Sequence, residues 1–384
     1  MQHSSPQPAP SASPQQAASR TLPFVASLVL GAAFFGLVAA VHGLTATASG
    51  SIPWLAALWL FVPAPVIFVW QGVLARSRNS TFAIPKRWRW LVKGYLVLAA
   101  VLSVAVLGGV GWIGSQRAIH PAASTYQRTL ADYPALQAAA EVVSFQVPQD
   151  GRRVGWFIPG RSKATVLLLH GYGGRREGML ARADVLHQAG YSVMLFDFRN
   201  RGESDGDAVS LGFHETQDAV EAVRYLNTRR DVDQGRLGVL GASMGASVAI
   251  LAASQAPELK AVIADSAFQS ASRAVEEGFT RETGLPRLPY SPIALAIIQL
   301  RLGVSPGDIV PEDHIRAISP RPILLIHGLA DSDLSPANSQ ALFAAAGEPK
   351  ELWLLPGSGH IDGIEDYPEE YARRMVQFFD SNLR

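Results

Sequence analysis

The residues best suited to chemistry in this chain lie in a short glycine-rich segment, residues 241–245, with Ser243 at its centre. An apolar run at 236–240 precedes it, and a run of small apolar residues at 246–254 follows it. A serine on a tight turn between a strand and a helix presents its hydroxyl as a nucleophile, and glycine two residues to each side gives the turn the space that it needs. Because the chain contains 34 glycines, this G-x-S-x-G pattern is weakly specific by itself. Its meaning depends on whether the other groups needed for acyl transfer are present.

A serine hydroxyl becomes an effective nucleophile when a positioned base removes its proton, and that base is most often histidine. His360 follows the apolar run at 351–355 in a glycine-rich loop, so we predict that it is the base. We expect the other histidines in the domain to be structural or solvated. His170 and His327 end apolar runs beside glycine, and the remaining three fall on predicted helices or loops: His187, His214 and His314.

The base needs a carboxylate to orient it, and in serine hydrolases built on a parallel sheet the chain order is serine, acid, histidine. The loop after the apolar run at 322–326 carries Asp331 and Asp333. We choose Asp331, which is closer to the end of the strand, with Asp333 as the first alternative. Asp265, after the preceding strand, is a second alternative acid.

The negative oxygen of a tetrahedral intermediate needs two N–H donors. One comes from the residue after the nucleophile, here Met244, and the other from the loop after an early central strand. Residues 170–174 lie at that place and contain three glycines, so we predict the N–H of Tyr172 as the second donor. The chain has no cysteine, which excludes a thiol nucleophile, disulfides and cysteine-bound metal. We expect no metal, no cofactor and no nucleic-acid partner.

The composition indicates that the N-terminal and C-terminal parts of the chain lie in different environments. Of the 384 residues 48% are hydrophobic and only 17% are charged, which is more apolar than an ordinary soluble enzyme. No acidic residue occurs before Asp132, whereas nine basic residues do. From Asp132 onward there are 24 basic and 32 acidic residues. We therefore expect an N-terminal membrane region and a C-terminal globular domain.

Three apolar runs at 22–44, 52–74 and 91–113 are each long enough to cross a bilayer. They follow a polar, disordered tail at 1–20 and make up a transmembrane region at 21–114. The loop between the second and third runs carries five basic residues, which places it in the cytoplasm and the C-terminal domain on the non-cytoplasmic side. In the alternative interpretation the first run is a cleaved signal peptide, and the domain lies on that same side.

The rest of the chain predicts a helical connector at 115–140 and an α/β domain at 141–384. Apolar strand-like runs alternate with helical segments from residue 141 onward, as in a mostly parallel sheet flanked by helices. The stretch at 267–321 interrupts this alternation and contains helical pieces, so we expect it to be a helical lid inserted after a strand.

From residue 141 to the end, the chain resembles the α/β-hydrolase superfamily, and most of all the membrane-anchored serine hydrolases of the Bem46-like and serine-aminopeptidase-like group. The resemblance rests on five motifs in family order, at residues 170–174, 197–204, 241–245, 327–331 and 359–360. It implies Ser243 as nucleophile, Asp331 as acid and His360 as base. The chain departs from the family after Asp333, where one extra residue precedes the proline, and in having three apolar runs instead of one anchor.

These observations lead to a membrane-anchored serine hydrolase that cleaves an ester, thioester or amide through an acyl-enzyme. A small or lipid-like acyl substrate is expected, because the site would be held near a bilayer. Two alternatives stay open: an aminopeptidase-type peptidase, and a non-catalytic module of the same fold that binds or senses an acyl ligand. The fold alone does not decide between them.

Overall fold

The computed structural model describes residues 86–284 and 287–383. The chain divides into two units, Met1–Leu107 and Gly108–Arg384. The predicted tail at 1–20 and the first two apolar runs, 22–44 and 52–74, lie outside the described residues.

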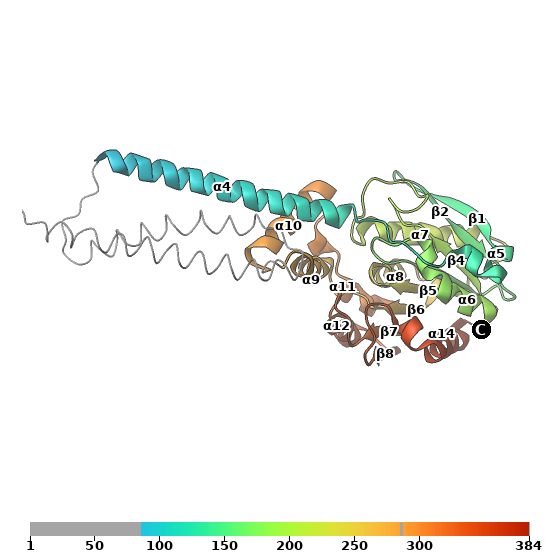
Figure 1. Ribbon diagram of the computed structural model, residues 1–384. Helices are drawn as coiled ribbons and strands as arrows, with labels where there is room; N and C mark the ends of the chain where they lie inside the picture. Colours follow the sequence, from blue (N-terminus) through green and yellow to red (C-terminus); the bar gives the residue numbers. More distant parts are fainter. Residues whose placement is uncertain (1–85, 285–286, 384) are drawn as a thin grey trace, which may run out of the picture. The chain divides into compact units, whose positions relative to one another are not determined.

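The third apolar run, 91–113, lies within α4, Lys86–Ile119, a single helix of 34 residues (Figure 1). Several of its large apolar side chains are more than half exposed: Trp90, Val97, Val101, Val104 and Trp112. Among the described residues, no single helix combines the length and the apolar character needed to cross a membrane. One pair of helices, Tyr290–Leu302 and Pro306–Ile318, meets both criteria only when the two are taken together across a bend of 90°.

The second unit is built on an eight-stranded sheet with the order β1-β2-β4-β3-β5-β6-β7-β8. The first two strands pair antiparallel, β2 pairs antiparallel with β4, and all the other pairs are parallel. The strands are β1 Glu141–Val147, β2 Gly151–Ile158, β3 Thr165–Leu169, β4 Ser192–Phe196, β5 Leu237–Ala242, β6 Leu259–Asp265, β7 Ile323–Gly328 and β8 Lys350–Leu355.

The central strands are mostly apolar because helices cover both faces of the sheet (Figure 1). All residues of β3, β4 and β5 are buried. Alternate side chains enter two separate cores, one formed with α7 and α8 and the other with α6 and α14. These helices are α6 Leu180–Gln188, α7 Phe213–Thr228, α8 Met244–Gln255 and α14 Pro368–Leu383. The shorter α12 and α13 span Ala337–Ala345 and Gly363–Asp366.

The segment between β6 and β7 is helical and does not contribute a strand, as predicted for the lid at 267–321. It contains α9 Ala271–Thr283, α10 Arg287–Leu302, η3 Pro306–Asp308, α11 Pro311–His314 and η4 Ile315–Ile318. Leu288 interrupts α10 with extended backbone angles, and Leu288 and Leu300 are 70% and 82% exposed. The mostly parallel sheet and the flanking helices confirm the predicted α/β-hydrolase architecture.

The prediction of a helical connector at 115–140 was only partly right. The described chain leaves α4 at Ile119, has no helix until η1, Leu130–Asp132, and then forms α5, Pro134–Ala139. Pro121 explains the break, because proline disfavours a helical residue before it and has no N–H to continue the helix. The irregular part bonds instead to the globular domain, where the N–H of Ser124 donates to the carbonyl oxygen of Gly173 (2.9 Å).

Candidate active site

Ser243 occupies the turn between β5 and α8 at the carboxyl edge of the sheet. Its backbone angles, φ 56° and ψ −122°, lie in a region that residues with a side chain rarely adopt. The turn is also too tight for side chains on the flanking glycines. A Cβ at Gly241 would lie 2.0 Å from the carbonyl oxygen of Gly245, and a Cβ at Gly245 would lie 2.2 Å from that of Leu169. The two glycines of the G-x-S-x-G pattern are therefore required by packing, and the strained turn lifts Ser243 out of the strand.

Ser243, His360 and Asp331 form one chain of hydrogen bonds. The Oγ of Ser243 lies 2.8 Å from Nε2 of His360, and Nδ1 of His360 lies 2.7 Å from Oδ2 of Asp331. Since a carboxylate only accepts hydrogen bonds, Nδ1 carries the proton and Nε2 is left to accept the serine proton. The three residues come from loops after β5, β7 and β8, which end at the same edge of the sheet.

Asp331 is held as a carboxylate although it is buried. Its Oδ1 accepts hydrogen bonds from the N–H groups of Asp333 (2.8 Å) and Leu334 (2.9 Å). Burial alone would raise the pKa of this carboxyl, but hydrogen bonds from His327 and His360 outweigh burial and hold the pKa well below its ordinary value. In turn, burial would lower the pKa of His360, but the hydrogen bond and charge of Asp331 outweigh it and raise that pKa.

His327 contacts the acid, which the sequence did not predict. It ends β7, is fully buried, and its Nε2 lies 3.1 Å from Oδ2 of Asp331 and 3.0 Å from the carbonyl oxygen of Leu334. Because both neighbours are acceptors, Nε2 is the protonated nitrogen, and Nδ1 accepts from the hydroxyl of Ser339 (2.6 Å). The only signal in the sequence was the spacing of four residues between this histidine and Asp331 after a strand.

Neither alternative acid hydrogen-bonds to His360 in the described structure. The carboxylate of Asp333 is about half exposed and pairs with Arg281 (3.3 Å). Asp265 ends β6 fully buried, and its Oδ2 accepts from Arg182 (2.7 Å) and from the hydroxyl of Tyr371 (2.8 Å). The geometry therefore favours Asp331 over the two alternative acids.

Arg182 connects Asp265 to the loop that carries His360. Its Nη2 donates to Asp265 and also to the carbonyl oxygen of Ile361 (3.1 Å), and its Nε donates to Tyr371 (3.1 Å). Ile361 follows the histidine directly and has φ 57°. Arg182 and Tyr371 lie far apart in sequence, on α6 and α14, so nothing in the sequence identified them as supports of the site.

The loop at 170–174 packs against the nucleophile. A Cβ at Gly171 would lie only 3.1 Å from the Cβ of Ser243. His170 anchors the loop, because its Nε2 accepts from the N–H of Phe198 (3.0 Å) and its Nδ1 lies 2.8 Å from the carbonyl oxygen of Gly171. Burial lowers the pKa of His170 to about 4, so the ring is neutral near pH 7.

The two predicted N–H donors, Tyr172 and Met244, each follow one of the two residues in contact, Gly171 and Ser243. Tyr172 follows Gly171 in the loop. Met244 is the first residue of α8, and the first N–H groups of a helix have no partner within that helix. The helix N-terminus also favours negative charge at this point.

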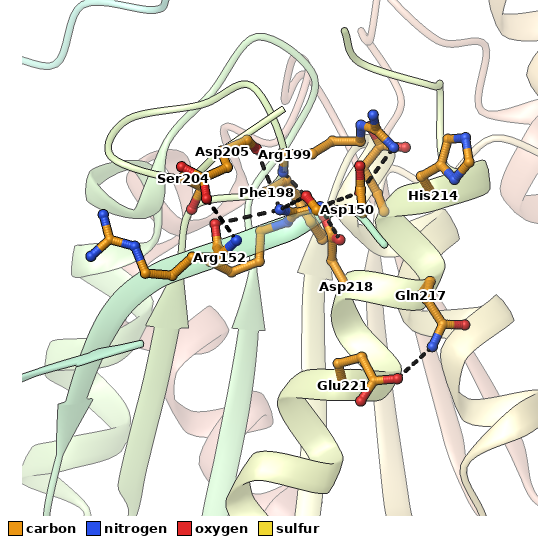
Figure 2. A network of polar contacts seen from close by, with 12 residues as sticks. Asp150, Arg152, Phe198, Arg199, Ser204, Asp205, His214, Gln217, Asp218 and Glu221 are labelled. Carbon is orange, nitrogen blue, oxygen red and sulfur yellow. Dashed lines mark hydrogen bonds and ion pairs between the residues drawn. The ribbon is translucent and has the colours of Figure 1, made fainter. Parts of the chain in front are cut away.

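A polar network supports the loop that follows β4 (Figure 2). The Oδ2 of Asp205 accepts from the N–H of Arg152 (2.8 Å), which joins this loop to β2. Asp218 on α7 accepts from the N–H of Arg199 (3.0 Å) and forms an ion pair with the buried Arg153 (2.8 Å). Burial outweighs these contacts and raises the pKa of Asp218 to about 6. The network holds the β1–β2 hairpin, α7 and this loop together.

The geometry can position a nucleophile and a base, with an acid behind the base. In the part of the chain that the structure describes, no cluster of three or more histidine, aspartate or glutamate side chains could hold a metal ion.

Comparison with known proteins gives relatives of the same fold. Residues 122–297 match the family model described as X-Pro dipeptidyl-peptidase (S15 family). The uncharacterised protein YfhR of Escherichia coli O157:H7 is 31% identical over 255 residues, covering 64% of this chain and 82% of YfhR. Rv2307c of Mycobacterium tuberculosis H37Rv, also uncharacterised, is 35% identical over 219 residues, covering 56% of this chain and 70% of its own.

Among solved structures, the esterase Pf2001 of Pyrococcus furiosus superposes with a TM-score of 0.58 at 27% identity, covering 69% of this chain and all of Pf2001. The chain therefore belongs to the α/β-hydrolase superfamily, in the family that contains YfhR, and is a hydrolase of that type.

Proposed function

We propose that this protein is a serine hydrolase that cleaves a carboxylic ester through an acyl-enzyme. The observation that carries the proposal is the unbroken chain from Asp331 through His360 to Ser243, with contacts of 2.7 and 2.8 Å, at a strained turn. A structural serine would need neither the strain nor the partly buried histidine and the buried carboxylate behind it.

In the proposed reaction, Ser243 attacks the substrate carbonyl while Nε2 of His360 takes its proton. Asp331 stabilises the imidazolium and keeps Nδ1 protonated. The N–H groups of Tyr172 and Met244 donate to the oxyanion, and one such donor contributes about 2.7–4 kcal/mol to the transition state. The imidazolium then protonates the leaving group. A water molecule, activated by the same histidine, releases the acid and restores Ser243.

A fluorophosphonate probe tests the nucleophile. We expect the full-length protein to be labelled once per chain and to lose both labelling and esterase turnover in Ser243→Ala. Ser254→Ala is the matched control, because this serine lies at the other end of α8 and bonds only to its own helix (2.7 Å to the carbonyl oxygen of Leu251). Labelling that persists in Ser243→Ala contradicts the assignment.

A peptidase is the second candidate, and the match of residues 122–297 to the S15 family favours it. The 27% identity with the esterase Pf2001, all of which is covered, supports an ester as the substrate. Turnover of a p-nitrophenyl ester series from acetate to palmitate, set beside aminoacyl-p-nitroanilides, separates the two. Hydrolysis of any of these substrates excludes the non-catalytic binding module.

We also propose that residues 21–114 anchor the protein in a membrane and that its substrate is lipid-like. The apolar runs at 22–44 and 52–74, each long enough in sequence to cross a bilayer, support the anchor. The exposed Leu288 and Leu300 on the lid helix α10 support an apolar substrate.

Alkaline phosphatase, which is active outside the cytoplasm, can be fused after residue 80 and at the C-terminus. The proposed orientation requires activity only at the C-terminus, and recovery of the protein in the soluble fraction would contradict the anchor.

A further inference from the structure

The segment from His120 to Tyr126, which we call the strap, lies against the loop at 170–175 that carries the proposed donor Tyr172. Two hydrogen bonds join them along their length. The N–H of Ser124 donates to the carbonyl oxygen of Gly173 (2.9 Å), and the N–H of Arg175 donates to the hydroxyl of Tyr126 (3.0 Å).

The side chain of Tyr172 itself makes a third hydrogen-bonded contact with the preceding chain. Its hydroxyl donates to the carbonyl oxygens of Arg117 (2.8 Å) and Ala118 (2.9 Å), in the last turn of α4. These carbonyls have no partner within the helix, because the last four of any α-helix lack one. The loop is therefore bonded both to the end of α4 and to the strap that follows it.

Packing makes the fit between strap and loop close. A Cβ at Gly173 would lie 3.2 Å from the carbonyl oxygen of Ala122, and φ at this glycine is +69°. A Cβ at Gly174 or Gly178 would lie 2.8 Å from the hydroxyl oxygen of Tyr126. The glycines of this region thus make room for the strap, and Tyr126 packs against Gly174 of the loop and against Gly178, which follows the loop.

The strap is itself fixed to the rest of the domain. The buried side chain of Arg201 donates to the carbonyl oxygen of Pro121 (3.0 Å). The N–H of Val209 donates to the carbonyl oxygen of Ile119, the last residue of α4 before the strap (2.9 Å). Both partners follow β4, so the strap is held between two loops at the carboxyl edge of the sheet.

The loop at 170–175 is neither helix nor strand, so no helical or sheet hydrogen bonds fix its backbone. An oxyanion donor is useful only if its N–H is held in place before the reaction, and a displacement of about 1 Å can cost on the order of a hundredfold in rate. We propose that the strap is a positioning element for the N–H of Tyr172, with Tyr126 as its principal positioning residue. The inference rests on the proposed serine-hydrolase function.

Tyr126→Phe in the full-length protein tests this inference, because it removes only the hydroxyl that accepts from Arg175. Rates are expressed per site labelled by the fluorophosphonate at completion, which removes any effect of misfolded protein. We expect kcat for a p-nitrophenyl ester to fall by about tenfold or more with KM unchanged. The affinity for a trifluoromethyl ketone, which forms a tetrahedral adduct with the serine, should fall by the same factor.

Tyr191→Phe is the matched control. It removes another tyrosine hydroxyl contact, to Asp380 (2.6 Å), on α14. A merely structural effect lowers the melting temperature and the number of labelled sites but leaves kcat per site unchanged, and this is the result expected for the control. If Tyr126→Phe behaves in the same way, the inference is wrong.

If Tyr126→Phe does not fold, Tyr172→Phe decides. It keeps the backbone N–H and removes the hydroxyl bonded to Arg117 and Ala118. The same fall in kcat and in ketone affinity supports positioning of the loop by the segment that precedes β1, from the end of α4 through the strap. Unchanged values contradict this positioning. Failure of the proposed function looks different, because wild-type protein would then neither be labelled nor turn over the ester.

Discussion

Two buried carboxylates end neighbouring strands of the sheet and have different partners. Asp265 ends β6 against Arg182 (2.7 Å) and Tyr371, and Asp331 follows β7 against His360 (2.7 Å) and His327 (3.1 Å). The strands themselves are paired in parallel, so both side chains lie at the carboxyl edge. By position alone, either carboxylate could orient the base.

The side chain that pairs with each carboxylate determines the role of that carboxylate. An arginine stays charged at any ordinary pH, so its pair with Asp265 is permanent and cannot respond to a proton that moves during a reaction. A histidine titrates near neutral pH, so the attraction between Asp331 and His360 grows when the ring takes up the serine proton. The comparison assigns the first carboxylate to support of the loop and the second to the chemistry. The four predictions that follow test that division, from the largest effect to the smallest.

Asp331→Ala should lower kcat by about 10³–10⁴-fold, because His360 loses the group that fixes its tautomer and stabilises its charge. Ester turnover per folded protein measures this effect. Asp333→Ala is the matched control, since its half-exposed carboxylate pairs with Arg281 at the surface and kcat should stay close to that of wild type. A larger loss in the control than in Asp331→Ala would reverse the assignment of the acid.

Asp265→Ala should act chiefly on stability. It leaves Arg182 buried without its carboxylate, which typically lowers the free energy of unfolding by about 3–5 kcal/mol. Urea denaturation measures this change. Adding Arg182→Met removes the unpaired charge and should recover part of the loss. A fall in kcat per folded protein as large as that of Asp331→Ala would end the distinction between the two carboxylates.

His327→Phe should lower kcat by about tenfold, because the acid loses one of its four hydrogen-bond donors and can turn away from His360. This is the size expected for removing one supporting hydrogen bond of a charged group, about 1.5 kcal/mol. His327→Gln keeps an N–H donor and should recover much of the activity. Equal activity of the phenylalanine variant and wild type would show that the contact with Asp331 has no role in turnover.

The pH dependence is the smallest and most specific effect. A base must be unprotonated to accept the serine proton, so activity is present above the pKa of His360 and is lost as pH falls through it. Burial lowers this pKa but the bond to Asp331 raises it more, so the midpoint of the acid limb of kcat/KM should lie above about 6.5, the value of an ordinary histidine. In Asp331→Asn, the residual activity should have its midpoint at lower pH. A wild-type midpoint below 6.5 would mean that the carboxylate does not act on the base.

The sequence was sufficient to predict the positions of most strands, because buried parallel strands are short continuous apolar runs. The segments expected at 165–169, 192–196 and 322–326 are strands in the structure, within two residues at each end. The order of the strands was not predictable, since it depends on which apolar faces pack together. The strap was misjudged for a related reason. Alanine and leucine around it favour helix, but Pro121 and hydrogen bonds to a loop some 50 residues away determined its structure.

The sequence by itself determined which groups could react. Ser243 between glycines, a histidine in a loop near the C-terminus and carboxylates after two late strands are matters of residue type and chain order. Only the tertiary structure decided which carboxylate faces His360, because both aspartates follow strands and the choice depends on arginine and tyrosine side chains from distant helices. The tertiary structure also added His327 and the strap, whose contacts join residues that the chain keeps apart. A hydrogen bond acts over about 3 Å in space whatever the separation in sequence, so only folding brings its two partners together.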